Sequence, residues 1–197
     1  MRVWAITGGI ASGKSTVSRF FAEQGAQLAS ADEDARAVLS DGSGTREAVL
    51  AAFGTLERDT LAERIFHDPQ ARTTLNGIMH PAIRRRMRSA IEAAQVNLLP
   101  GLFLYEVPLL YEGGLETWFE GVIAVLASPA QQLARLQARG LSQSAAEARL
   151  HAQLSPEEKA RRADIVIHTD VPEEETRVAV REAYQKLVDT ESAKTLI

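Results

Sequence analysis

The sequence predicts an α/β protein built on a doubly wound, five-stranded parallel sheet. Five short apolar runs have the length and composition of buried strands, and helical patterns fill the intervals between them. A glycine-rich motif also lies directly between the first strand and the first helix, where parallel sheets commonly bind ligands. The predicted strands are residues 3–7, 27–29, 101–106, 121–127 and 164–168.

The glycine-rich motif, residues 8–15, satisfies the pattern G-x-x-x-x-G-K-[ST]. Its glycines permit a backbone whose N–H groups point into one concavity at a helix N-terminus, where the helix dipole also favours anions. Lys14 is placed to reach the β- and γ-phosphates of a nucleotide, and Ser15 to bind Mg²⁺. An accidental glycine-rich turn is the alternative, but the flanking strand and helix favour phosphate binding. The expected binding residues are Gly9, Ile10, Ala11, Ser12, Gly13, Lys14, Ser15 and Thr16.

The next segments bring acidic residues to the predicted sheet edge. The first helix ends at Gly25, a typical residue just past a helix C-terminus. The strand at 27–29 then delivers Ser30 and Asp32 to the edge that holds the phosphate loop, because carboxyl ends of parallel strands meet there. We expect a helix over residues 32–39 and a loop over 41–44.

Residues 45–97 show helical patterning only and form a predicted helical insertion. One helix is expected to start with an N-cap at Asp59. After Pro81 the helical pattern has an apolar stripe on one side and arginines on the other. The arginine side is either a solvated face or a contact for a phosphorylated substrate. The stripe is Ile83, Met87, Ala90, Ile91 and Ala94, and the arginines are Arg84, Arg85 and Arg88.

The C-terminal half alternates strand and helix again. A helix begins at Ser128 and Pro129, an N-cap and a first-turn proline, and ends at Gly140. Residues 142–162 are polar, rich in arginine and interrupted near Ser155-Pro156, which is typical of a lid. Pro172 and three glutamates then start a last helix, whose inward side chains are Val180, Ala183, Tyr184 and Leu187.

Composition restricts the function classes. With 197 residues the chain has room for one sizeable core, and the absence of cysteine excludes disulfides, thiol nucleophiles and cysteine-ligated zinc. A net charge of −4 argues against a broad nucleic-acid surface. We see no signal peptide or membrane span and expect a cytoplasmic protein. The histidines lack metal-binding spacing, so no zinc site is expected; they are His67, His80, His151 and His168.

Phosphoryl transfer is the reaction class that fits the remaining features. The N-K-x-D element of guanine-selective switches is missing, and the chain is short for a motor. Asp32 and Glu106 follow or end predicted strands, where they would face an acceptor hydroxyl. Closure of the lid region would bring positive charge onto the transferred group and exclude water. The arginines in and before that region are Arg135, Arg139, Arg149, Arg161 and Arg162.

The order and spacing of these motifs resemble the signature of dephospho-coenzyme A kinases from the first strand to about Ile167. The resemblance implies ATP-dependent phosphorylation of the ribose 3′-hydroxyl of dephospho-CoA, the final step of coenzyme A synthesis. It also implies a nucleotide core at 1–44, 98–140 and 163–197, a CoA-binding segment at 45–97 and a lid at 141–162. The matching motifs are residues 7–17, Ala31-Asp32, Ala35-Arg36, Arg58, Leu61-Ala62, Ile65-Phe66, His80-Pro81-Ala82-Ile83, Pro108-Leu109-Leu110-Tyr111-Glu112, Gln132-Leu133, Arg135, Arg139, Gln153 and Ala163-Asp164.

The resemblance, together with the motif, assigns roles to individual residues. Asp32 would be the catalytic base, beside Lys14 and Arg139 as catalytic cations, with Arg135 as a further candidate cation. The alternatives are that Asp32 is a helix N-cap and that Arg139 forms a surface ion pair. ATP and Mg²⁺ would be the cosubstrate and metal, with Ser15 as metal ligand. The implied substrate-binding residues are Asp32, Arg36, His80, Leu109 and Glu112.

Some of these assignments have a structural alternative. His80 is either a substrate contact or a structural hydrogen-bonding residue, and Tyr111 and Glu112 are either packing elements or walls of the acceptor pocket. The chain also departs from the family pattern at three positions. Ser30 stands where an Asp is common, Glu106 where Asp is frequent, and Thr169 where Asn is frequent, near expected adenine contacts.

Two other functions remain open at this point. The chain could be another small-molecule kinase of the same sheet type, acting on a nucleoside monophosphate or a sugar acid. It could also be a noncatalytic module that senses nucleotide and reports to a partner protein. The motif and its context, rather than the fold, distinguish these classes.

Overall fold

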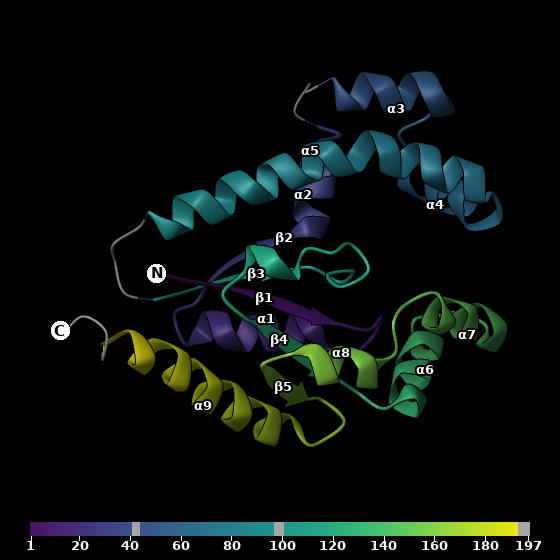
Figure 1. Cartoon of the computed structure of the whole chain (residues 1–197). Coiled ribbons are helices and arrows are strands. Elements are labelled where there is room, and N and C mark those ends of the chain that lie inside the picture. Colours follow the sequence, from purple (N-terminus) through teal and green to yellow (C-terminus); the bar gives the residue numbers. More distant parts are fainter. Residues whose placement is uncertain (41–43, 97–100, 193–197) are drawn as a thin grey trace. The chain divides into compact units, whose positions relative to one another are not determined.

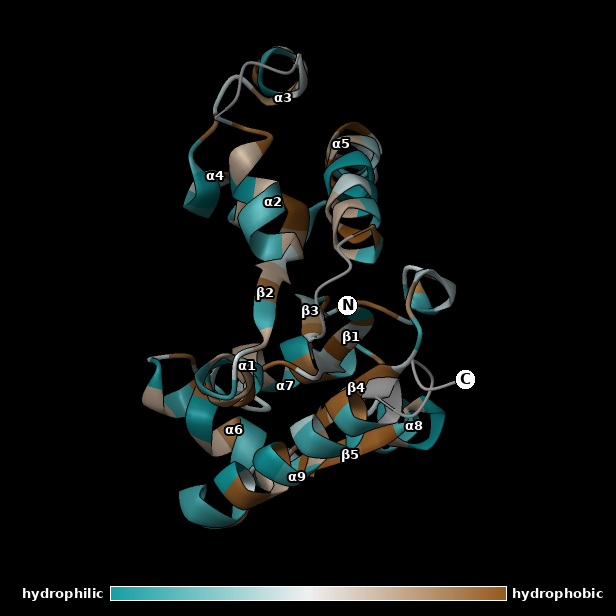
Figure 2. Ribbon diagram, turned by 90° about the vertical axis from the view of Figure 1, so that its left-hand side faces the viewer, coloured by the Kyte–Doolittle hydropathy of each residue, from teal (hydrophilic) through white to brown (hydrophobic). Residues whose placement is uncertain are grey.

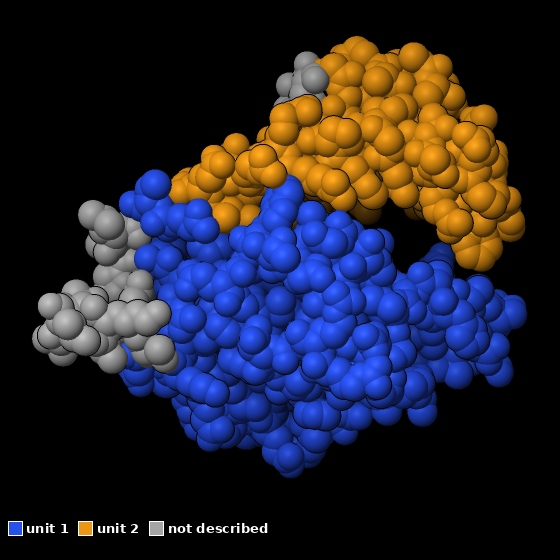
Figure 3. Space-filling view, in the orientation of Figure 1, with its two compact units in different colours: residues 1–29, 94–197 blue, residues 30–93 orange. Residues whose placement is uncertain are grey.

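The computed structural model describes residues 1–40, 44–96 and 101–192. These residues form two compact units, coloured separately in Figure 3. Unit 1 comprises residues 1–29 and 94–197, and unit 2 comprises residues 30–93. Residues 30–44, which we expected to belong to the nucleotide core, therefore start unit 2 where they are described. The predicted loop at 41–44 lies almost entirely outside the described residues.

The sheet confirms the predicted α/β fold. Its five strands have the order β2-β3-β1-β4-β5, and the pairs β1–β3, β1–β4 and β4–β5 are parallel (Figure 1). Each predicted strand is present, with bounds shifted by at most one residue at an end. The strands are β1 (Arg2–Gly8), β2 (Gln27–Ser30), β3 (Leu102–Glu106), β4 (Val122–Leu126) and β5 (Ile165–His168).

Both faces of the three central strands β3, β1 and β4 are buried, which explains why these strands are almost continuously apolar. Trp4 and Ile6 belong to one core cluster with the helices α1 (Lys14–Glu23) and α9 (Glu173–Ser192). Their neighbours Val3 and Ala5 on the other face are fully buried too. Figure 2 shows this hydrophobic character most clearly in β4 and β5. The clustered side chains from the helices are Val17, Phe20, Phe21, Val180, Ala183 and Leu187.

The helices of unit 1 begin where sequence chemistry predicts. Ser128 accepts a hydrogen bond from the Gln131 N–H at the start of α6, as expected of an N-cap. Ser155 caps α8 in the same way, which explains the predicted interruption near Pro156. The helical elements are α1 (Lys14–Glu23), the 3₁₀ turn η1 (Glu116–Trp118), α6 (Pro129–Ala138), α7 (Gln143–His151), α8 (Pro156–Arg162) and α9 (Glu173–Ser192).

Apart from Ser30 at the end of β2, the regular secondary structure in the described residues of unit 2 is helical, as predicted. Its core joins side chains from all four helices and their connections, including Val38, Val49, Phe53, Leu61 and Met79. The helices are α2 (Ala31–Ala37), α3 (Thr45–Phe53), α4 (Arg58–His67) and α5 (Pro69–Gln95), the last of which extends two residues into unit 1. No helix in the described ranges is both long and apolar enough to cross a membrane.

One expectation in unit 2 was wrong. The predicted N-cap Asp59 lies inside α4, which begins at Arg58 after Glu57. Pro81 lies within the long α5. The apolar stripe that follows it is confirmed at Met87, Ile91 and Ala94, which are buried. Packing of that stripe offsets the hydrogen bond that an internal proline removes.

Two glycine-to-alanine substitutions should change stability in opposite directions. A Cβ on Gly121 would lie 2.5 Å from the ring of Trp4, which is itself buried, so Gly121→Ala should destabilise by about 1–3 kcal/mol. Gly77 lies in α5 with no atom within 4 Å of an added Cβ, so Gly77→Ala should stabilise by about 0.5–1 kcal/mol. Urea unfolding of both variants tests this, and equal shifts would contradict it.

Candidate active site

The phosphate loop (residues 8–15) joins β1 to α1 and has the backbone of an anion cradle. Gly13 has φ of 91°, in the left-handed region that favours glycine, and Ala11 has φ of 56°. Gly8 has no room for a side chain, because a Cβ there would lie 2.5 Å from the Val125 carbonyl oxygen. Sterics at both glycines therefore fix the loop as the motif predicts.

Several N–H groups of the loop and of the first turn of α1 are available to an anion. Those of Ala11, Gly13 and Ser15 donate to no group within the described ranges. The Lys14 ammonium donates to the carbonyl oxygens of Gly8 at 3.0 Å and Gly9 at 3.1 Å, so it lies over the loop. Amides, helix dipole and lysine together give the loop the positive potential that a triphosphate requires.

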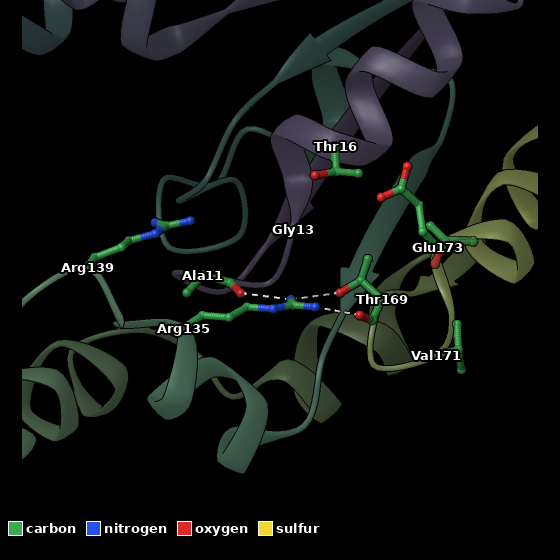
Figure 4. Close-up of a pocket in the computed structure, with 9 residues that line it drawn as sticks. Ala11, Gly13, Thr16, Arg135, Arg139, Thr169, Val171 and Glu173 are labelled. Carbon is green, nitrogen blue, oxygen red and sulfur yellow. Dashed lines mark hydrogen bonds between the residues drawn. The ribbon is translucent and has the colours of Figure 1, made fainter. Parts of the chain in front are cut away.

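A pocket of about 250 Å³ lies beside the loop, between the first turn of α1 and the segment after β5. Arg135 crosses one side of it (Figure 4). Its guanidinium donates to the Ala11 carbonyl at 3.1 Å, and to the hydroxyl and carbonyl of Thr169 at 3.0 and 2.5 Å. The lining residues are Ala11, Gly13, Thr16, Arg135, Arg139, Thr169, Val171, Glu173 and Thr176.

The two candidate arginines differ in how they are engaged. The Arg135 guanidinium donates hydrogen bonds to carbonyl and hydroxyl groups of the protein, and it thereby supports the loop. Arg139 lies just past α6 and is exposed, and its guanidinium makes no ion pair or hydrogen bond with the described residues (Figure 4). The surface ion pair considered for Arg139 is therefore not formed there. Of the two, Arg139 therefore stays the predicted catalytic cation.

Asp32 occupies the first turn of α2, and it is not the helix N-cap. That position belongs to Ser30, whose hydroxyl accepts the Asp32 N–H at 3.2 Å. The Asp32 side chain is exposed, and Arg36 donates to its backbone carbonyl rather than to its carboxylate, at 3.2 Å. The N-cap alternative for Asp32 is therefore wrong, and its carboxylate has no capping duty.

His80 lies on α5 in unit 2 and is exposed. Partial burial, and secondly the positive charge of Arg84, lower its pKa from the ordinary value of 6.5. The imidazole is therefore mainly neutral at physiological pH, which suits a hydrogen bond better than a charge contact. Arg36 and His80 stay predicted substrate contacts, and both belong to unit 2.

Glu112 is engaged with a lysine that sequence reasoning did not single out. Lys159 on α8 is 1% exposed, and its ammonium contacts the Glu112 carboxylate at 2.9 Å and the Pro108 carbonyl at 2.8 Å. The Leu154 N–H donates to the same Glu112 oxygen at 3.0 Å. Burial alone would raise the pKa of Glu112, but these hydrogen bonds outweigh it and lower the pKa.

The residues around Glu112 divide between packing and exposure. Tyr111 is buried under the Arg162 guanidinium, 4.1 Å from its ring, and burial raises its pKa to about 12. Leu109 is 48% exposed, so it is accessible to a ligand. Tyr111 therefore packs, while Leu109 and Glu112 stay predicted substrate contacts. Lys159 lies in a polar segment without periodicity, so no pattern marked it for burial.

Glu106 ends β3 next to β1, in register with Ile6, two residues before the phosphate loop begins. Its carboxylate accepts the Ser18 hydroxyl at 3.0 Å. No three acidic or histidine side chains gather in the described part of the chain as a metal site would need. A place with so few protein oxygens is compatible with Mg²⁺, because this ion commonly takes one or two protein oxygens and completes its coordination shell with phosphates and water.

We expect Glu112→Gln to destabilise unit 1 in a pH-dependent way. Removing the charge partner of buried Lys159 should cost about 1–3 kcal/mol at neutral pH. Because the folded-state pKa of Glu112 is lowered, the carboxylate's contribution is present above the ordinary value of 4.5 and is lost as pH falls through the folded pKa. The difference from wild type should therefore shrink in acid.

Urea unfolding from about pH 7 to about pH 3 measures this difference. Glu182→Gln, at an exposed position on α9, is the matched control and should change little at any pH. A Glu112→Gln difference that is constant across the whole pH range would contradict the assignment.

Comparison with known proteins identifies the family. A family model described as dephospho-CoA kinase matches residues 2–175. A dephospho-CoA kinase of Streptomyces avermitilis is 40% identical over 192 residues, which cover 93% of this chain and 92% of that protein. One of Syntrophotalea carbinolica is 40% identical over 200 residues, covering 95% and 93%.

Solved structures agree with the sequence comparisons. A dephospho-CoA kinase from Campylobacter jejuni has a TM-score of 0.73 at 27% identity, covering 97% of this chain and 100% of its own. The crystal structure of TT1252 from Thermus thermophilus has a TM-score of 0.78 at 30% identity, covering 94% and 97%. Since the family model and these relatives span nearly the whole chain, it belongs to the dephospho-CoA kinase family.

Proposed function

We propose that this chain transfers the γ-phosphoryl group of ATP to the ribose 3′-hydroxyl of dephospho-CoA, giving ADP and coenzyme A. The observation that carries the choice of acceptor is the match of the dephospho-CoA kinase model over residues 2–175. The geometry of the phosphate loop supports the ATP side independently, because its free amides and Lys14 suit a triphosphate.

Positioning and charge neutralisation carry most of the catalysis of phosphoryl transfer, because the transition state is loose. In our proposal the loop amides and Lys14 hold the β- and γ-phosphates. Arg139 supplies positive charge from the pocket side, since the described residues leave its guanidinium without a partner. Residues 9–16 are then the nucleotide-binding segment.

Asp32 is our candidate base. The 3′-hydroxyl oxygen attacks the γ-phosphorus, its proton passes to the Asp32 carboxylate, and ADP leaves with the electron pair of the broken P–O bond. Two observations support this role: Asp32 lies two residues after the end of β2, and its exposed carboxylate does not cap α2. Ser30 takes the capping position, so Asp32 is left for chemistry.

Mg²⁺ is the metal that fits the residues present. The Ser15 hydroxyl, at the start of α1, would be a direct ligand of the ion. The Glu106 carboxylate, at the end of β3, would accept a hydrogen bond from a water molecule bound to the ion. When bound, Mg²⁺ neutralises the charge that develops on the β- and γ-phosphate oxygens. The hydroxyl of Ser18 holds the Glu106 carboxylate in place.

Unit 2 is our candidate for the acceptor-binding part, with Arg36 and His80 as contacts and residues 45–97 as the CoA-binding segment. Leu109 and Glu112 would contribute from unit 1, and residues 141–162 would act as the lid. The absence of cysteine suits the reducing cytoplasm, where we place this activity. The net charge of −4 supports small-molecule substrates over nucleic acid.

An acceptor panel tests the proposed reaction. Purified protein with ATP and Mg²⁺ is offered dephospho-CoA, nucleoside monophosphates and sugar acids in a coupled ADP assay, and products are identified by mass spectrometry. We expect dephospho-CoA to stimulate ADP release at least about a hundredfold over the other acceptors, because binding energy from its remote parts aligns the hydroxyl. Stronger stimulation by another acceptor would indicate a different small-molecule kinase. Tight ATP binding without any phosphorylated product would indicate a nucleotide sensor.

Asp32→Asn tests the base. We expect kcat to fall by about a hundredfold or more while the ATP dissociation constant changes less than about twofold, since the amide keeps the shape but cannot take the proton. Glu33→Gln, at the next exposed position of α2, is the matched control and should keep near wild-type turnover. Retained turnover in Asp32→Asn would refute the assignment of Asp32.

A further inference from the structure

The peptide groups of Ile10, inside the phosphate loop, are held from both sides by two glutamines that are distant in sequence. Gln132 on α6 donates through Nε2 to the Ile10 carbonyl oxygen at 2.7 Å. Gln153, between α7 and α8, accepts the Ile10 N–H through Oε1 at 2.9 Å. One loop residue therefore has both its backbone groups bound by side chains from outside the loop.

The chemistry of the backbone fixes which end of each glutamine faces Ile10. A carbonyl oxygen only accepts and an N–H only donates, so Gln132 must present its amino group and Gln153 its oxygen. The two glutamines consequently have opposite requirements at the same residue. Replacing each glutamine by glutamate should therefore have different effects at the two positions, because glutamate keeps the acceptor oxygen but loses the amino donor.

Gln132 packs closely enough to define the loop's path. It is 1% exposed, and a Cβ on Gly9 would lie 2.5 Å from its Nε2. The glycine at position 9 therefore makes room for the glutamine, and the glutamine occupies the space that a side chain there would take. Loop and α6 fit together at this point.

Because the peptide bond is planar, a hydrogen bond that holds a loop carbonyl also fixes the direction of the N–H that follows it. In a trans peptide the C=O of one residue points opposite to the N–H of the next. Holding the Ile10 carbonyl against Gln132 therefore turns the Ala11 N–H to the other side. That N–H is one of the amides that donate to no group in the described ranges.

The next two carbonyls are held in the same manner. Arg135 binds the Ala11 carbonyl at 3.1 Å, and the Thr169 hydroxyl donates to the Ser12 carbonyl at 2.5 Å. Three consecutive carbonyls thus point at donors from α6 and the segment after β5. This arrangement also maintains the left-handed backbone of Ala11, with φ of 56°, which an alanine adopts only at a cost.

We propose that Gln132 and Gln153 are positioning residues for nucleotide binding, which hold the Ile10 peptides so that the loop amides face the phosphates. The proposal rests on the proposed ATP site but not on the identity of the acceptor. Gln153 lies in the segment predicted as a lid, so part of that segment supports the loop instead of moving over it.

Matched substitutions test the proposal through the dissociation constant of ADP, measured by calorimetry on the purified full chain. Gln132→Met and Gln153→Met remove the hydrogen bond at similar length, and each should weaken ADP binding about three- to tenfold, as expected for one lost hydrogen bond. Gln131→Met, at the exposed neighbouring position on α6, is the control and should bind ADP as wild type does.

The glutamate variants provide the discriminating comparison. Gln153→Glu keeps an acceptor for the Ile10 N–H, whereas Gln132→Glu places an oxygen against the Ile10 carbonyl. Both add the same charge, so the difference between them reports mainly the hydrogen bond. We expect Gln132→Glu to bind ADP at least about fivefold more weakly than Gln153→Glu.

A purely structural role would have another signature. It would lower the thermal midpoint and the active fraction, whereas a positioning role raises KM for ATP with kcat and KM for the acceptor close to wild type. Equal ADP affinity in the two glutamate variants, or wild-type affinity in both methionine variants, would overturn the proposal. Failure of dephospho-CoA as an acceptor would overturn the proposed function and leave these ADP measurements interpretable.

Discussion

The rest of the site depends on the hydrogen bonds that side chains outside the phosphate loop donate to the carbonyl groups of that loop. A loop of successive N–H groups facing one point is unfavourable by itself, because their dipoles repel and the carbonyls need partners. Here residues 10–12 find those partners in side chains from α6 and from the segment after β5. The cradle is therefore a product of the folded unit 1, and the motif alone does not create it.

The same principle explains a lysine that is buried beside the site. An ammonium group inside a protein is costly unless it is paired and hydrogen-bonded. Lys159 meets this condition through Glu112 and the Pro108 carbonyl, which also accepts the Thr7 hydroxyl at 3.3 Å. The result fixes α8 to the turn after β3, next to the strand that feeds the phosphate loop. Any lid movement must therefore be accommodated mainly in the part of residues 141–162 that precedes Gln153.

The strands, the loop and the helical insertion were predictable because they depend on local patterns. Apolar runs, caps such as Ser128 and the motif at 8–15 each carry their signal within a few residues. The N-cap expected at Asp59 was wrong, because the boundary of a helix can shift by one or two residues without changing the pattern that predicts the helix. The roles of Gln132, Gln153 and Lys159 were not predictable, since each depends on a partner at least 47 residues away in the chain that only the fold brings near.

Ser30, which stands where the family commonly has Asp, separates two roles: capping the first turn of α2 and accepting a proton. The first turn of α2 needs a side-chain acceptor before it, and both serine and aspartate provide one. With Ser30 as the cap, the helix start is retained without a second carboxylate at that position. A hydroxyl satisfies the backbone there as a carboxylate would, but it accepts a proton far less readily. The loss of the first acid therefore leaves the architecture of α2 unchanged and concentrates the proposed proton transfer on Asp32.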